Sequence, residues 1–271
     1  MNEKVIERND YLNKIIARKG NGLIKVITGI RRCGKSYMLN NLFYNYLIED
    51  GVKDDHIIKL ALDREENVEY HDSKKLNKYI LSQIKDDDIY YVLIDEIQLA
   101  DGFEFVLNGL LYEKNIDVYV TGSNSRFLSS DIITEFRGRG DEVRIYPLSF
   151  AEFVNAYDGD RYEAWNEYIT YGGMPLILRQ HTDEQKGKYL MSLYDLTYKK
   201  DIVDRNSIDK PDILDTLINI LASSVGSLTN PQKIYNTFIS NGITDISKNT
   251  IISYMDYLLD SFLIEKAQRY D

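Results

Sequence analysis

Residues 23–36 read LIKVITGIRRCGKS, an apolar run that leads into a loop bounded by two glycines and closed by a lysine and a serine. The last eight letters fit the pattern G-x-x-x-x-G-K-[ST] at every fixed position, and a run with helical periodicity follows at 35–48. An apolar strand before the loop and a helix after it are the context that a phosphate-binding loop requires. An accidental match is the alternative, and this context argues against it.

Each fixed residue of the loop has a chemical role toward phosphate. Glycine lets backbone N–H groups face an anion, and the N-terminus of the following helix favours negative charge. Lys35, which we expect to be exposed, reaches the β and γ phosphates, and Ser36 supplies an oxygen ligand to magnesium. Cys33 is either a small residue on the loop wall or a redox-sensitive thiol. The predicted nucleotide-binding residues of the loop are Gly29, Ile30, Arg31, Arg32, Cys33, Gly34, Lys35, Ser36 and Tyr37.

Short apolar runs alternate with helical periodicity over the first 150 residues. This alternation is typical of a parallel sheet with helices on both faces, so we predict an α/β P-loop NTPase fold. The expected strands are 23–28, 57–62, 89–94, 116–121 and 143–146, and the expected helices are 35–48, 73–84, 103–114 and 127–136.

Helical periodicity replaces the strand signals after Phe150. We expect helices at 151–156, 162–170 and 187–204, and three more that begin near Asp212, Pro231 and Ser247 before an extended stretch at 262–270. Three helices and a strand follow the order of a winged helix that stops before its second strand. The predicted domains are a nucleotide-binding domain at 1–150, a helical lid at 151–209 and a partial winged helix at 210–271.

A second acidic motif lies about 60 residues after the loop. YYVLIDE at 90–96 is an apolar strand that ends in two acids, which is the form of a Walker B motif. We expect Asp95 to hold the magnesium shell and Glu96 to orient or deprotonate the attacking water. The alternative is an ordinary acidic turn at the end of a strand, and the phosphate-binding loop favours the catalytic interpretation.

Two further segments supply candidates for catalysis. VYVTGSN at 118–124 is a strand with a polar end, so Ser123 or Asn124 is a candidate sensor of the γ phosphate, with a simple turn as the alternative. In RGRG at 137–140, Arg139 is a candidate arginine finger, and a solvated loop is the alternative.

Composition narrows the class of protein. A formal charge of −10 opposes broad attraction to nucleic acid or anionic lipid, and the one cysteine excludes an internal disulfide. The polar N-terminus does not resemble a signal peptide, and no apolar run approaches the length of a membrane span. We therefore expect a cytoplasmic protein without a membrane partner.

The order of these motifs resembles a bacterial and archaeal family of AAA-type P-loop ATPases. That family is related to the signal-transduction ATPases with numerous domains and to origin-recognition ATPases. The segments that carry the resemblance are TGIRRCGKS at 28–36, LIDEIQ at 93–98, TGSNSRFLSS at 121–130, FRGR at 136–139, YPLSFAEF at 146–153 and YGGMP at 171–175.

The resemblance implies ATP and Mg²⁺ as ligands and a Gly-x-Pro element that approaches the nucleotide base from the lid. In this sequence the element is Gly173-Met174-Pro175. From the residues alone, the two glycines and the proline only end a helix and turn the chain. Family members usually continue into a further C-terminal domain, which we expect to be absent here.

Two functions remain open at this point. One is in-line hydrolysis of ATP, and the other is a nucleotide-operated switch in which ATP and ADP hold different poses and turnover is slow. A protein partner or self-association fits both functions. DNA contact is disfavoured, because the expected recognition helix from Ser247 contains one basic residue, Lys248, and two acidic residues, Asp256 and Asp260.

Overall fold

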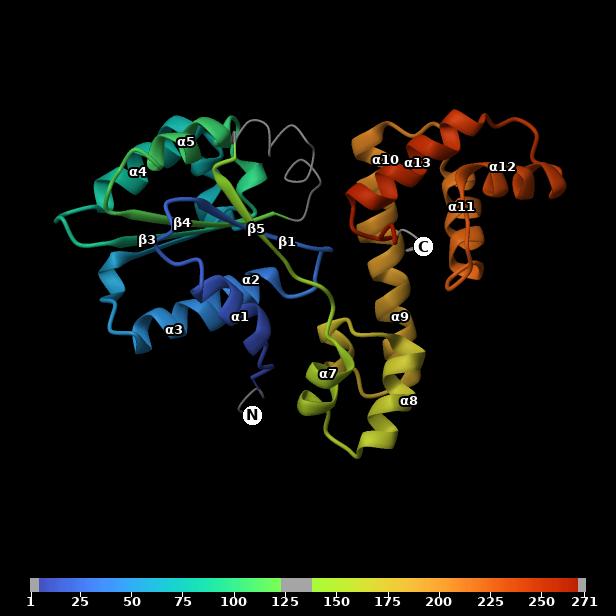
Figure 1. Cartoon of the computed structure of the whole chain (residues 1–271), viewed down its shortest axis with the longest axis horizontal. Helices are drawn as coiled ribbons and strands as arrows, with labels where there is room; N and C mark the ends of the chain where they lie inside the picture. The colour runs from blue at the N-terminus through green and yellow to red at the C-terminus, as the bar shows by residue number, and fades with distance from the viewer. Residues whose placement is uncertain (1–4, 123–137, 268–271) are drawn as a thin grey trace. The chain divides into compact units, whose positions relative to one another are not determined.

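The computed structural model describes residues 5–122 and 138–267, which form two compact units, Met1–Tyr189 and Leu190–Asp271. Figure 1 shows the course of the chain. The strands are β1 (Ile24–Thr28), β2 (Ile57–Ala61), β3 (Tyr90–Asp95), β4 (Ile116–Thr121) and β5 (Gly140–Arg144). The helices of the first unit are α1 (Asn9–Ile16), α2 (Lys35–Tyr37), α3 (Tyr44–Glu49), α4 (Ser73–Gln83), α5 (Phe103–Leu110), α7 (Phe150–Ala156) and α8 (Arg161–Tyr171), and α9 (Asp183–Leu193) runs into the second.

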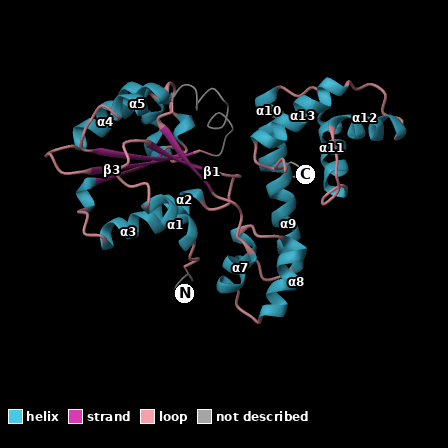
Figure 2. Ribbon diagram, in the orientation of Figure 1, coloured by secondary structure: helices cyan, strands magenta, loops and turns pink. Residues whose placement is uncertain are grey.

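The five strands form one parallel sheet in the order β2-β3-β4-β1-β5, with helices on both faces (Figure 2). Helices α4 and α5 cover one face, and α1, α2 and α3 cover the other (Figure 1). The predicted α/β fold is therefore confirmed. Because β1 lies between β4 and β5, the loop that follows it emerges beside the carboxyl end of β4 and not at an edge of the sheet.

Four of the five strands begin and end within a residue of their predicted bounds, but β5 does not. The sequence predicts a strand at 143–146, whereas β5 spans Gly140–Arg144 and pairs with β1 from Ile24↔Gly140 to Thr28↔Arg144. This edge strand is only partly buried and contains Asp141 and Glu142, so its pairing does not depend on apolar residues. Hydrophobicity alone therefore misplaced it.

The α7–α8 segment, which we define as residues 150–179, packs as a helical pair within the first unit. Ser149 and Glu152 form a capping box at the start of α7, and Asp160 and Glu163 form another at the start of α8. Aromatic rings join the two helices, with ring centroids 5.1 Å apart for Phe150–Trp165 and 5.3 Å apart for Phe153–Tyr168. The segment ends in a 3₁₀ turn, Pro175–Arg179.

The second unit is helical in its described part, with α10 (Lys200–Asn206), α11 (Pro211–Ser223), α12 (Pro231–Ser240) and α13 (Lys248–Asp260). Its core includes Leu214, Leu217, Ile234, Phe238, Ile251 and Leu258, each at most 1% exposed. The three helices expected after residue 210 are all present, but residues 262–267 form no strand and Phe262 has a φ of 59°. The wing of a winged helix stays a prediction.

The helix predicted at 187–204 is present and begins earlier, because α9, a π-helical stretch at Tyr194–Lys199 and α10 follow one another without a break. Among the described residues, no helix combines the length and the apolar character that crossing a bilayer requires.

A buried ion pair joins β1 to β4. Lys25 is fully buried and Asp117 is 5% exposed, and the Lys25 ammonium donates a hydrogen bond to one carboxylate oxygen of Asp117. The other oxygen accepts from the Tyr119 hydroxyl at 2.8 Å and from the Gly20 N–H at 2.9 Å. The ionic attraction and these additional hydrogen bonds together offset much of the free-energy cost of removing the two charges from water.

Removing one partner of this pair should destabilise the fold strongly. We expect Lys25→Met to lower the free energy of unfolding by about 3–5 kcal/mol, because Asp117 then keeps a buried charge without its cation. Chemical denaturation measures the difference. The control is Lys53→Met, because Lys53 and Asp88 form a pair in which both side chains are 66% exposed, and no measurable change is expected there. A loss no larger in Lys25→Met than in the control would contradict the role given to the pair.

Candidate functional site

The phosphate-binding loop begins at a position that accepts only glycine. Gly29 has a φ of 139°, and a Cβ on it would lie 2.1 Å from the carbonyl oxygen of Ile145. Gly34, with a φ of 104°, precedes α2. These two glycines let the loop turn tightly between β1 and α2, which satisfies the strand-loop-helix context.

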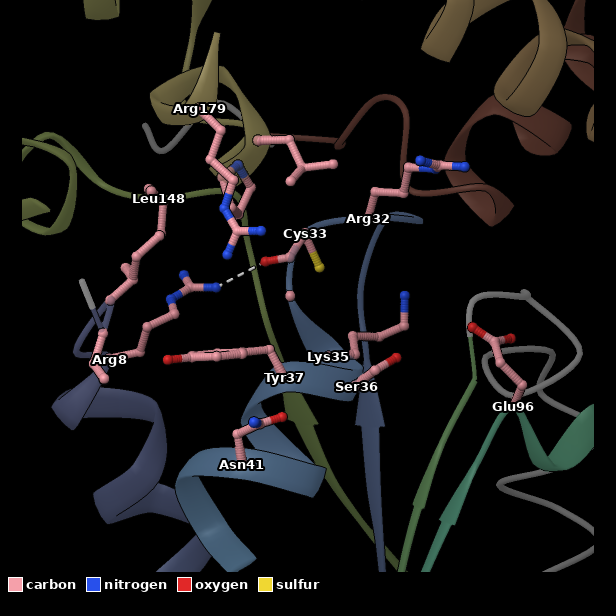
Figure 3. A pocket seen from close by; sticks show the side chains of 15 residues that line it. Arg8, Arg32, Cys33, Lys35, Ser36, Tyr37, Asn41, Glu96, Leu148 and Arg179 are labelled. Carbon is pink, nitrogen blue, oxygen red and sulfur yellow. Dashed lines mark hydrogen bonds between the residues drawn. The ribbon is translucent and has the colours of Figure 1, made fainter. Parts of the chain in front are cut away.

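Lys35 is not the exposed residue that the sequence led us to expect. Its side chain is buried, with 4% exposed, and its ammonium donates hydrogen bonds to the carbonyls of Gly29 at 2.9 Å and Ile30 at 3.2 Å. The curled loop closes over its own lysine, which explains the difference. The two carbonyls hold the Lys35 ammonium in place, and Figure 3 shows the Lys35 side chain next to Ser36.

A cavity of about 480 Å³ opens beside this loop (Figure 3). Four cationic side chains line it, namely Arg8, Arg32, Lys35 and Arg179, against one carboxylate, Glu96. The other residues that line it are Val5, Ile6, Cys33, Gly34, Ser36, Tyr37, Asn41, Leu148, Pro175 and Leu176. The cavity thus has a cationic part and an apolar part, both formed by the first unit.

Asp95 lies at the carboxyl end of β3, next to the loop. It is 4% exposed, and it accepts hydrogen bonds from the hydroxyl groups of Ser36 and Thr121. Burial raises the pKa of Asp95, and the charges of Glu96 and Asp63 raise it further, although the two hydroxyl donors act in the opposite direction. A buried carboxylate with acidic neighbours and a serine hydroxyl beside it is a set of oxygen donors suited to Mg²⁺.

Glu96 leaves the strand in a different direction from Asp95. Its φ of 54° is unusual for a residue other than glycine, and its N–H donates to the Thr121 hydroxyl at 3.0 Å. The carboxylate lines the cavity and accepts a hydrogen bond from the side-chain amide of Gln98. The turn after β3 therefore presents the second acid to the cavity while the first stays buried.

Arg8 precedes α1 and contacts three parts of the chain around the site. Its side chain is 2% exposed, and it forms an ion pair with Glu152 of α7. Its guanidinium also donates to the backbone carbonyls of Cys33 and Tyr146, at 3.0 and 2.8 Å. Arg8 and Arg179 extend toward the same part of the cavity from different elements (Figure 3).

The α7–α8 segment contributes one wall. Pro175 and Leu176 line the cavity. Gly173 does not line the cavity and packs against the backbone of Leu148. The Leu148 N–H donates to the Gly173 carbonyl at 2.7 Å, and a Cβ on Gly173 would lie 2.1 Å from the Leu148 oxygen. Gly172, with a φ of 74°, ends α8. The helix-ending interpretation thus fits Gly172, and a contact of Gly173 and Pro175 with a base stays a prediction.

The cavity includes only part of the predicted loop set. Residues 32–37 line it, whereas Gly29, Ile30 and Arg31 do not. The Cys33 side chain is fully buried and donates to the Ile145 carbonyl at 3.4 Å. Burial raises the pKa of the Cys33 thiol, although nearby Lys35 and Arg8 oppose this effect. A buried thiol held in its neutral form corresponds to the wall residue and not to a redox switch.

Arg139 lies at the wrong end of the sheet for contact with this cavity. Its carbonyl accepts from the Ile24 N–H at 2.9 Å, at the start of β1, and its guanidinium lies 5.9 Å from the Tyr112 ring. The five residues of β1 separate the end of the sheet at which Arg139 lies from the phosphate-binding loop by about 16 Å. Arg139 therefore does not fit an arginine finger within one chain, and a finger from a second copy stays a prediction. Ser123 and Asn124, the candidate sensors, lie outside the described residues.

Sequence reasoning did not single out several residues of the site. Arg8, Asn41 and Arg179 are single polar residues in helical surroundings, and no local pattern marks them. Thr121 belongs to the predicted strand, and its hydroxyl connects Asp95 with the Glu96 N–H. A signal for Thr121 existed, because a polar residue ends an apolar strand beside the two acids.

Comparisons with known proteins show the family of this chain. A family model described as an AAA domain matches residues 21–154, and a model described as a domain of unknown function matches residues 162–271. An uncharacterized protein of Haemophilus influenzae is 36% identical over 100% of this chain, which spans 68% of that protein. An uncharacterized protein of Methanocaldococcus jannaschii is 31% identical over 96% of this chain, which spans 59% of that protein.

A solved structure supports the fold. A Walker-type ATPase of Pyrococcus abyssi superposes with a TM-score of 0.64 at 15% identity, and the match covers 96% of this chain and 91% of the other. At this level of identity the likeness concerns the fold alone.

The buried Asp95 gives a prediction about stability. Its pKa in the folded protein is raised above the ordinary value of 3.8, so its ionisation opposes folding, and the corresponding stability is present at acidic pH and lost as the pH rises through the folded-state pKa. We expect Asp95→Asn to raise the thermal midpoint by a few degrees at pH 7.5 in buffer with EDTA, and the difference from the parent protein to disappear as the pH falls through that pKa.

Thermal unfolding between pH 4 and 8 provides the measurement. Asp88→Asn is the control, because the Asp88 side chain is 66% exposed and should give no such pH-dependent gain. A variant at Asp95 that is less stable than the parent over the whole range would show that the carboxylate stabilises the fold.

Proposed function

Because this chain belongs to a family of AAA-type ATPases, we propose that it binds ATP with Mg²⁺ in the cavity beside residues 29–36 and hydrolyses it. The observation that supports this most is the charge of the cavity. Besides Arg8, whose charge is paired with that of Glu152, three cations line it in a chain whose formal charge is −10. Such a local excess of positive charge suits a triphosphate, and it is not a general property of this acidic surface.

The shape of the cavity suits the two ends of ATP. The loop N–H groups and Lys35 would hold the phosphates, and the apolar part formed by Val5, Ile6, Leu148, Pro175 and Leu176 would accept the adenine base. Tyr37 and Asn41 are four residues apart and line the cavity together, since residues at this spacing share one face of a helix.

Two oxygen donors would hold the metal. Ser36 and Asp95 already share a hydrogen bond, and the raised pKa of Asp95 indicates that a nearby cation would be favourable for its charged form. When bound, Mg²⁺ neutralises charge on the β and γ phosphates. Among the chain's own residues, Lys35 would neutralise further charge, and Glu96 would position or deprotonate the attacking water.

One observation favours a switch with slow turnover as the second candidate. The Glu96 carboxylate accepts a hydrogen bond from Gln98, a residue of the same turn. This bond restrains the direction of the carboxylate, and a base that is not aimed at the attacking water deprotonates it slowly. ATP bound by the isolated protein with a steady-state turnover near zero would support the switch, and sustained turnover would support the hydrolase.

The charge of α13 bears on the partner. In its exposed positions the helix has one cation, Lys248, and two carboxylates, Asp256 and Asp260. Repulsion between these carboxylates and phosphate opposes DNA contact along the helix. We propose a protein partner or a second copy of the chain in preference to DNA.

The first test of the proposed function removes the phosphate-binding cation. We expect Lys35→Met to weaken ATP affinity at least about a hundredfold, because a charge-assisted contact to the phosphates is lost. Calorimetric titration gives the affinity, and thermal unfolding checks the fold, since two loop carbonyls lose their donor. Lys53→Met is the matched control and should bind ATP like the parent. Unchanged affinity in folded Lys35→Met would remove the loop from the nucleotide site.

The second test separates binding from chemistry. Glu96→Gln should bind ATP like the parent and hydrolyse it at least about a hundredfold more slowly, since general-base contributions range from about 10² to 10⁴. Phosphate release and ATP titration on the same preparation measure both quantities. Glu113→Gln, at an exposed position after α5, is the control. Equal rates in Glu96→Gln and the parent would assign the water to another group.

A further inference from the structure

We propose that Arg8 is a positioning residue that fixes the phosphate-binding loop and the first turn of α7 in one arrangement, so that nucleotide binding and the order of the α7–α8 segment are coupled. This inference rests on the proposed nucleotide function. It concerns a residue that lies 25 positions before Cys33 and 144 positions before Glu152, so it connects three separate parts of the chain.

The contacts of the guanidinium carry the inference. The side chain is 2% exposed, and all three guanidinium nitrogens donate hydrogen bonds. Nε donates to Glu152 Oε1 at 2.9 Å and Nη2 donates to Glu152 Oε2 at 3.2 Å. Nη1 donates to the Cys33 carbonyl at 3.0 Å, and Nη2 also donates to the Tyr146 carbonyl at 2.8 Å and the Pro147 carbonyl at 3.5 Å.

The bond to Cys33 sets the direction of a loop N–H. A trans peptide unit is planar, so its carbonyl and the next N–H point in opposite directions. When Arg8 holds the Cys33 carbonyl on its own side, the Gly34 N–H is turned away from Arg8. Gly34 is the second fixed glycine of the loop, and its N–H is among those expected to face phosphate. The position of a Gly34 Cβ would lie 3.8 Å from Arg8 Nη1, so the arginine lies against this peptide.

The bond to Glu152 sets the start of α7. Glu152 is the third residue of that helix and closes the capping box by accepting from the Ser149 N–H at 2.8 Å. Burial opposes the ionisation of Glu152, but the hydrogen bonds from Arg8 and from Ser149 outweigh it and lower the pKa of this carboxyl. The first turn of α7 is therefore held by a charged acceptor that depends on Arg8.

Because Arg8 is ion-paired, it acts on the site through the positions of its hydrogen bonds and not through its net charge. Arg8 and Glu152 are neutral as a pair, so their main effect on a triphosphate is not attraction. The planar fork of the guanidinium supplies parallel bonds to a carboxylate and further bonds to carbonyls, and a lysine ammonium cannot reproduce that pattern from one nitrogen. If the competent arrangement is less populated without Arg8, the apparent nucleotide affinity falls by the same fraction.

The test compares nucleotide affinity and amide exchange in matched variants. Arg8→Ala and Arg8→Lys should each weaken affinity for ADP with Mg²⁺ by about tenfold or more, since a hydrogen bond to a charged group is lost. Glu152→Gln should weaken it in the same direction. The combination of Arg8→Ala with Glu152→Gln should be no weaker than Arg8→Ala alone, because both remove one interaction.

Arg18→Ala is the control. Arg18 follows α1 and pairs with Asp141 of β5 at 2.7 Å, so it anchors the other end of the same helix away from the cavity. The affinity of the Arg18→Ala variant for ADP should remain within about twofold of the parent's, because the pair that is lost is partly exposed.

Hydrogen exchange supplies a readout that a purely structural role would not change. In the parent protein, ADP should slow exchange both at residues 29–37 and at residues 150–156. In Arg8→Ala, at ADP concentrations that saturate the variant, the slowing should persist at 29–37 and be lost at 150–156. If Arg8→Ala does not fold, Arg8→Lys and Glu152→Gln take its place in both measurements.

Three outcomes would overturn an assignment. A folded Arg8→Ala that binds ADP like the parent and keeps the slowing at 150–156 overturns the positioning role. Full affinity in Arg8→Lys shows that charge is sufficient and overturns the geometric role. Failure of the parent protein to bind ADP or ATP overturns the proposed nucleotide function itself, which distinguishes that failure from the first two.

Discussion

The backbone of residues 145–148 is the structural feature on which the site depends. The Ile145 carbonyl lies where a side chain on Gly29 would be and accepts from the Cys33 thiol. The next two carbonyls accept from Arg8, and the Leu148 carbonyl accepts from the Tyr168 hydroxyl at 2.9 Å. One extended segment after β5 thus receives the phosphate-binding loop, the N-terminal segment and the α7–α8 segment.

Much of the fold could be predicted from the sequence because local rules determine it. The apolar runs of β1 to β4 predicted the sheet, and the N-caps Asn230 and Ser247 marked two helices of the second unit. Where local rules do not apply, prediction failed. The charged strand β5 is placed by its pairing with β1, and the π-helical stretch Tyr194–Lys199 has no residue pattern that distinguishes it from α-helix.

The candidate site divides in the same way. The loop and the two acids could be predicted, since their spacing is local and their chemistry requires few residue types. The burial of Lys35 and the contacts of Arg8 could not, because they depend on residues far apart in sequence. Asp95 illustrates the physical conflict: the same burial that makes it a suitable magnesium ligand makes its charge unfavourable for folding. The site is thus arranged for a cation and not for maximal stability.

The edge strand β5 has a consequence for association. Three of its five residues, Asp141, Glu142 and Arg144, are charged, and the strand forms one of the two edges of the sheet. Exposed edges present unpaired backbone groups that can recruit a strand from another molecule, and charged side chains on the edge discourage this. The polarity that made β5 difficult to recognise in the sequence therefore protects the sheet against uncontrolled β-aggregation.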